Sequence, residues 1–133
     1  MKYLCVGYLD KSKMDSLTKA QIDDVMSDCP AYMDEFYDSG KVLLVAGTPP
    51  ESKCMRRLDG KVEISDGPAG GASEAIGCVF LIEAADIEDA IRVASLHPTT
   101  RIAAGEKLGF RIEVSPVHYF DERALKSDAA EPK

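Results

Sequence analysis

Two carboxylates flank a glycine-rich segment in the middle of the chain, where Asp66 precedes the segment and Glu74 lies near its end. Such a pair can act as a general base or hold a cation, so both residues are candidate ligand-binding groups. An Asp before Gly-Pro also commonly closes a turn with its own side chain, which is the structural alternative for Asp66. Neither G-x-x-x-x-G-K-S/T nor G-x-G-x-x-G is present and no Lys or Arg occurs from Asp66 to Glu83, so no nucleotide site is predicted.

The two histidines, His97 and His118, carry the side chain best suited to proton transfer near neutral pH. They stand 21 positions apart with no adjacent cysteine, so the sequence predicts no metal site and no cofactor. The four cysteines form no C-x-x-C pair, and we expect them to be reduced core residues. Arg101 is a further candidate ligand-binding residue, which either receives an acidic ligand or pairs with surface carboxylates.

The net charge of the chain indicates which classes of molecule are not expected to bind it. The chain has 133 residues, which suits a single domain, and its 16 Lys and Arg against 23 Asp and Glu give a formal net charge of −7. This charge repels nucleic-acid phosphates and anionic lipid head groups, so neither is an expected partner. Because no run of about 18 apolar residues and no secretory leader pattern is present, we expect a cytoplasmic protein.

Apolar patterning predicts two β–α–β units joined by a hairpin. Strands are expected at 3–9, 42–46, 78–84 and 110–117, and the hairpin at 55–58 and 62–65, with Asp59-Gly60 as its turn. Residues 66–77 are predicted to form a loop, and a polar tail at 121–133 follows the domain at 1–120.

Two helical regions separate these strands. The first is expected between 19 and 39, with a capping box at Thr18 and either a kink or a break at Pro30. The second begins after Asp86, ends at His97-Pro98 and is predicted to place Ile87, Ala90, Ile91 and Ala94 on one face.

This element order predicts a ferredoxin-like α+β sandwich, in which both helical regions cover one face of an antiparallel sheet. The opposite face is then an apolar surface in an acidic protein, and such a surface must be covered. A second copy of the same sheet is the simplest cover, so we expect a homodimer through the strands around Cys5, Leu44 and Leu81.

Four short motifs occur in a fixed order: Asp66-Gly67-Pro68, then Gly77, then Leu-Ile-Glu-Ala at 81–84, and Ile-Glu-Val-Ser-Pro-Val at 112–117. With these motifs the chain resembles the YCII-related family, DGPF subgroup, over residues 1 to 120. The resemblance implies a dimeric α/β barrel built from ferredoxin-like protomers, which agrees with the topology above. Most members have no assigned activity.

The resemblance also implies a cleft between helix and sheet in which a histidine and an aspartate form an acid–base pair. The histidine follows a Pro-Ala step in the first helix, where this chain has Tyr32, and the aspartate precedes a proline after the second helix, where this chain has His97. His97 can shuttle a proton and Tyr32 can donate a hydrogen bond to an oxyanion. Alternatively, His97 contacts the last helix carbonyls and Tyr32 belongs to the core.

Two hypotheses follow for function. The first is a small-molecule-binding or regulatory dimer, because DGPF relatives resemble modules associated with extracytoplasmic-function sigma factors. The alternative is a cofactor-free acid–base enzyme, of lyase, isomerase or dehalogenating type, that uses His97 and Tyr32.

Overall fold

The four-stranded sheet at the centre of the protein is antiparallel throughout. The computed structural model describes residues 1–68 and 73–123. Strands lie in the order β2-β5-β1-β6, with bounds Lys2–Asp10 for β1, Val42–Gly47 for β2, Glu74–Glu83 for β5 and Arg111–Pro116 for β6. Each β–α–β unit thus places its two strands on either side of a strand from the other unit. This arrangement confirms the predicted ferredoxin-like α+β fold.

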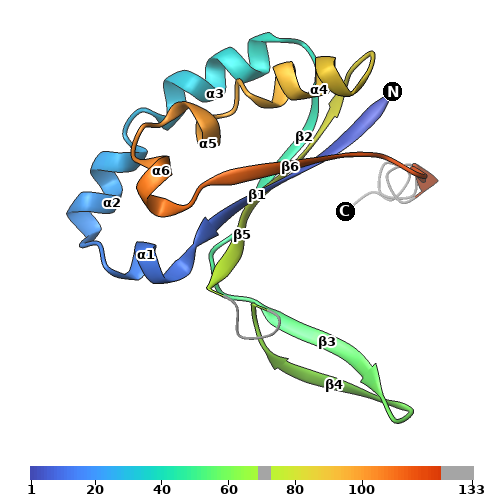
Figure 1. The fold of residues 1–133 in the computed structure, drawn as a ribbon. Helices are drawn as coiled ribbons and strands as arrows, with labels where there is room; N and C mark the ends of the chain where they lie inside the picture. Colours follow the sequence, from blue (N-terminus) through green and yellow to red (C-terminus); the bar gives the residue numbers. More distant parts are fainter. Residues whose placement is uncertain (69–72, 124–133) are drawn as a thin grey trace, which may run out of the picture.

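All helices lie on one side of this sheet (Figure 1). Their bounds are Lys11–Asp15 for α1, Lys19–Met26 for α2, Cys29–Asp38 for α3, Ile87–Ala94 for α4, Pro98–Arg101 for α5 and Gly105–Leu108 for α6. Pro30 occupies the first turn of α3, where its missing N–H costs no hydrogen bond, so the predicted region is two helices rather than one kinked helix. Among the described residues, no helix combines the length and apolar character needed to cross a bilayer.

Two further strands, β3 (Lys53–Leu58) and β4 (Lys61–Asp66), form a separate antiparallel sheet. We call this hairpin the arm, and Figure 1 shows it extending away from the main sheet and the helices. Its turn uses Asp59 and Gly60, with φ of 51° and 78°, which are the left-handed values that a tight two-residue hairpin turn requires. The predicted hairpin is confirmed and is longer than expected.

The core fills the space between the main sheet and the helices. Cys5 and Phe80 point from neighbouring strands to the helical side and are fully buried, together with Phe36 of α3. The alternate residues point to the other side, which we call the open face, and there Leu4 and Leu44 are 39% and 45% exposed. Cys5 therefore faces away from the surface that was predicted to dimerise, whereas Leu44 and Leu81 lie on it.

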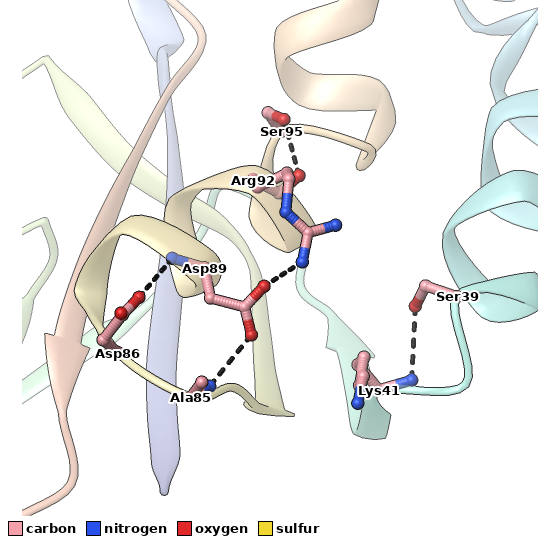
Figure 2. Close-up of polar contacts among 7 residues, drawn as sticks. All are labelled: Ser39, Lys41, Ala85, Asp86, Asp89, Arg92 and Ser95. Carbon is pink, nitrogen blue, oxygen red and sulfur yellow. Dashed lines mark hydrogen bonds and ion pairs between the residues drawn. The ribbon is translucent and has the colours of Figure 1, made fainter.

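Helix α4 is fixed at its start by reciprocal hydrogen bonds. The backbone N–H of Asp89 donates to Asp86 Oδ1 at 2.8 Å, and the N–H of Ala85 donates to Asp89 Oδ2 at 2.9 Å (Figure 2). Arg92 pairs with Asp89 one turn further on. Asp86 is thus the predicted N-cap, and the start of α4 sets where the chain leaves the helix toward His97.

The predicted face of α4 is confirmed for Ala90 and Ala94 and wrong for Ile87 and Ile91. Ile91 is 54% exposed, and the buried residues are Ala90, Val93 and Ala94. These three share a face with His97, at the i, i+3, i+4 and i+7 spacing, so the small residues bring the helix close to the sheet and the isoleucines turn outward.

Two other expectations also need correction. Strand β5 begins at Glu74, inside the segment predicted as a loop, because it pairs with β1 from Asp10 onward; residues 69–72 of that segment lie outside the described residues. Cys54 lies on the arm rather than in the core, so only part of the cysteine prediction holds, although all four thiols are free.

Candidate functional site

His97 lies just beyond the end of α4 and is 7% exposed. Its ring stacks on Phe80, with centroids 4.8 Å apart and an interplanar angle of 15°, and the ring of Phe36 meets it edge to face at 5.3 Å. Two aromatic side chains from the sheet and from α3 therefore hold the imidazole in one orientation.

The hydrogen bonds of His97 fix its tautomer. The backbone N–H of Thr99 donates to His97 Nδ1 at 3.1 Å, and Thr99 Oγ1 lies 2.8 Å from the same atom. A ring nitrogen that accepts an N–H is unprotonated, so the proton of the neutral ring is on Nε2. The His97 side chain thus caps α5, while the backbone N–H of His97 donates to the Ala94 carbonyl at the end of α4 at 3.0 Å.

The Nε2 atom of His97 has a different environment. It makes no hydrogen bond within the described residues, and yet no buried side-chain nitrogen or oxygen there lacks a partner, so Nε2 is accessible, on a residue that lines the adjacent cavity. Burial lowers the pKa of His97 from 6.5 to about 4. At neutral pH the cavity therefore faces an uncharged N–H donor.

The cavity next to His97 has a volume of about 200 Å³ and lies between the sheet and the helices. Its wall is mainly apolar and combines strand positions, two thiols, two thioethers and the segment after α4. The lining residues are Gly7, Tyr8, Leu9, Met26, Cys29, Met33, Gly77, Cys78, His97, Pro98, Thr99, Ile102 and Phe110. A concave, apolar site with one or two polar groups is the common form of a small-molecule site.

The strand wall of the cavity depends on Gly7. A Cβ atom at this position would stand 2.4 Å from Cys78 Sγ and 3.6 Å from Thr99 Oγ1. Gly7 pairs with Cys78 at the point where the register between β1 and β5 shifts, so the thiol occupies the space that a side chain would need. The glycine here leaves room for the Cys78 side chain.

The two thiols in the cavity are protonated at neutral pH. Burial raises the pKa of Cys78, and it also raises the pKa of Cys29 with a smaller contribution from the charge of Asp28. Cys29 Sγ lies 3.7 Å from Met26 Sδ. Because the thiolate is the nucleophile, these cysteines form part of an apolar wall and are not activated for attack.

Tyr32 and Arg101 lie together, but outside the wall of this cavity. The guanidinium of Arg101 stacks over the Tyr32 ring at 4.7 Å from its centroid, and it pairs with Glu35 at 2.9 Å. Tyr32 is not among the residues that line the cavity with His97. The structure therefore does not bring the two predicted catalytic residues into one pocket, and Arg101 already has an acidic partner.

Glu74 lies on the open side of the sheet. It accepts two hydrogen bonds from Arg111, from Nε and from an Nη atom, both at 2.6 Å, and these bonds lower the pKa of Glu74. Arg111 also lies 4.3 Å over the centroid of the Tyr8 ring. Asp66 ends β4 on the arm, where it pairs with Lys53 and is exposed to solvent.

A second, wider hollow of about 690 Å³ lies where the base of the arm meets the open face. It is lined by Glu74, Tyr8 and Ile76 from the sheet and by residues 48–54. Its one glutamate beside the sheet is already paired with Arg111, so this hollow offers fewer free polar groups than its size suggests. In the described part of the chain, no group of three or more His, Cys, Asp or Glu is arranged to hold a metal ion.

The cavity and most of the fold lie in a part of the chain that matches a known protein family. The family model for the YCII-related domain matches residues 1–110. The chain belongs to the YCII-related family. No curated protein matches it. The matched range ends at Phe110, so every residue that lines the cavity lies within the YCII-related domain. The match does not extend to the DGPF subgroup, which stays a prediction.

Sequence reasoning missed most of the cavity. Thr99, Cys29 and Cys78 belong to no sequence motif, and among the lining residues only His97 was predicted from the sequence to be a site residue. The His-Pro step did carry one usable signal, since a proline at the first position of a helix makes the residue before it the N-cap.

Proposed function

We propose that this YCII-related protein binds a small, uncharged, largely apolar molecule in the cavity beside His97. The observation that carries this proposal is the fixed tautomer of His97, because Thr99 occupies Nδ1 and leaves the proton on the accessible Nε2 of a residue that lines the apolar cavity. A single donor in such a wall selects a ligand with one hydrogen-bond acceptor.

The chemical class of the ligand follows from the cost of transferring groups from water. A charged ligand would lose its hydration without meeting an opposite charge, because His97 is neutral and the cavity thiols are protonated. A neutral carbonyl compound loses less hydration free energy than a charged ligand, and it regains a hydrogen bond from Nε2–H. We therefore propose a small carbonyl-bearing molecule whose remaining surface is hydrocarbon.

The acid–base enzyme receives less support than the binding function. A general acid–base pair needs two groups within reach of one substrate, and Tyr32 lies against Arg101 instead of lining the cavity. With its proton on Nε2 and a pKa of about 4, His97 presents a hydrogen-bond donor to the cavity and no basic nitrogen.

We also propose that the protein acts as a cytoplasmic homodimer. Support comes from the open face, where Leu4 of β1 and Leu44 of β2 are exposed on either side of Leu81 of β5. A two-fold axis would bring two such faces together. Light scattering should then give a mass of about twice 14.4 kDa, and a monomer at micromolar concentration contradicts this proposal.

Binding can be tested with two probes of nearly the same shape, acetophenone and cumene, which differ in the carbonyl oxygen. Because cumene is the more hydrophobic probe, the preference for acetophenone is taken as its affinity relative to cumene, and NMR titration should show this ratio about tenfold higher in the wild-type protein than in a variant without the Nε2–H donor. Shifts should concentrate on the residues that line the cavity.

Two variants of His97 provide matched controls. His97→Asn keeps an acceptor for the Thr99 N–H but loses the donor at the position of Nε2, so the preference for acetophenone should fall about tenfold. His97→Gln keeps a donor near that position and should retain part of the preference. The same preference in all three proteins, or shifts outside the cavity, would rule out the proposed role of His97.

A further inference from the structure

The arm presents an apolar face that no other part of residues 1–68 and 73–123 covers. Cross-strand pairing places Met55 opposite Ile64 and Arg57 opposite Val62, so these four side chains share one face. Met55 and Ile64 are 69% and 66% exposed, and Val62 is also exposed. The other face of the arm carries Cys54, Arg56, Leu58, Lys61, Glu63 and Ser65.

A two-stranded hairpin of this kind is marginal on its own in water. Strands β3 and β4 form a sheet of their own, which extends away from the body of the protein (Figure 1). In the described part of the chain, no helix or third strand packs on this sheet. Its three exposed apolar side chains are costly to keep in water, and their alternation with polar residues is typical of a face that packs on another surface.

Charge distinguishes the arm from the rest of the chain. Residues 53–66 contain four of the 16 Lys and Arg but only three of the 23 Asp and Glu, so the excess of negative charge lies elsewhere in the chain. Arg56 and Arg57 have no ion pair within residues 1–68 and 73–123. A basic, apolar arm is therefore suited to an acidic, apolar surface.

The open face of the sheet is apolar and belongs to the part of the chain that carries the excess of negative charge. Its exposed apolar residues include Leu4, Leu44 and Ile76, and its carboxylates Glu74, Glu83 and Glu113 are paired with Arg111, Lys2 and the N-terminal ammonium group. The arm of the same chain leaves the sheet at the end near Glu74 and extends away from it. A second copy thus offers an apolar face, and outside its own residues 53–66 it has 12 Lys and Arg against 20 Asp and Glu.

We infer that the Met55–Val62–Ile64 face of each arm packs against the open face of a second copy of the chain, so that two arms are exchanged across the dimer axis. This inference rests on the homodimer proposed above. It adds that the arms, and not the flat sheets alone, hold the two copies together, and that the arm is stable only when it is docked.

Trypsin provides a direct test, because the arm holds four cleavage sites at Lys53, Arg56, Arg57 and Lys61. We expect cleavage within the arm to slow as protein concentration rises, in parallel with dimer formation measured by sedimentation. Docking should protect these sites, whereas a free arm is cut at the same rate at every concentration.

Two threonine variants separate the two faces of the arm and keep its strand propensity. Ile64→Thr on the apolar face should raise the dimer dissociation constant about tenfold and restore cleavage, while Leu58→Thr on the opposite face should change neither. Dimers whose arms are cut at every concentration, or equal effects of the two variants, overturn the arm exchange but leave a dimer through the sheets intact. A monomer at all concentrations overturns both.

Discussion

The two sides of the main sheet come from the same strands but differ in what covers them. On the helical side, Phe80 is fully buried and stacks on His97, whereas Leu4 and Leu44 on the open side remain in contact with solvent. The arm is the most exposed of these surfaces, since nothing in residues 1–68 and 73–123 covers its apolar face. Alternating strands supply apolar residues to both sides of the sheet, and the helices make a concave site on one of them.

The largest difference in stability between the helical side and the arm is expected when a core aromatic ring is removed. Phe80→Ala should destabilise the protein by about 4 kcal/mol, because it removes the ring that stacks on His97 and leaves a void against Phe36. Met55→Ala on the arm should change stability by less than about 0.5 kcal/mol. Urea unfolding of dilute, monomeric protein measures both values, and similar losses would show that the arm belongs to the cooperative core.

Thiol labelling compares the same regions by reactivity. Burial, with a smaller effect of nearby Cys78, raises the pKa of Cys5 to about 12 from 9.0, which leaves about a thousandfold less thiolate than an unperturbed cysteine has. Cys54 on the arm should therefore label first and Cys5 last, with four thiols reacting after denaturation. Mass spectrometry after brief alkylation identifies the sites. A fast phase that survives in Cys54→Ser, or a native disulfide, would contradict this order.

Acidification should weaken the helical side through His97. Its folded-state pKa of about 4 lies below the unfolded value of 6.5, so the unfolded chain binds the proton more readily between these values. The stabilisation is complete above pH 6.5 and is lost as the pH falls toward 4, by about 2 kcal/mol between pH 7 and pH 4.5.

Two histidine variants isolate this effect from the carboxylates, which also lose their partners on acidification. The pH-dependent loss in urea unfolding should shrink by about 2 kcal/mol in His97→Gln. His118→Gln, which changes an exposed side chain outside the cavity, should retain the wild-type loss. A similar slope in His97→Gln and the wild type would mean that His97 is charged in the fold.

The smallest expected effects test whether the arm unfolds independently. Asp86→Ala removes the N-cap of α4 and should lower global stability by about 1 kcal/mol. Gly60→Ala forces a Cβ into a left-handed conformation at a similar cost, but in the arm alone. Hydrogen exchange should therefore quicken at arm amides only in Gly60→Ala, with no change in the global unfolding midpoint.

The sequence predicted the elements better than it predicted the site. Strands such as 42–46 and the Asp86 cap follow from patterns within a few residues, which is why they were confirmed. Helices α5 and α6 have four residues each and are too short to show a period. The first residues of β5 were missed because pairing with β1 overrode their glycine-rich composition.

The cavity required information that no local pattern contains. His97 attracted attention because an imidazole is rare and chemically versatile, but its neighbours Cys29 and Cys78 come from a helix and a strand that meet only after packing. The position of Tyr32 outside the cavity wall has a related cause. Met33 and Phe36 take the side of α3 that packs on the core, and Tyr32, one position away, meets Arg101 instead.

The residue type at the position of Gly7 has a consequence for the cavity in related proteins. The single hydrogen of Gly7 keeps open the space that Cys78 Sγ occupies at the wall of the cavity. A relative with a larger residue at this position and a cysteine at the position of Cys78 has to move that thiol, and the wall of the cavity changes with it. The residue types at these two strand positions, read together, thus indicate which members of the family can retain this wall before any of their structures are known.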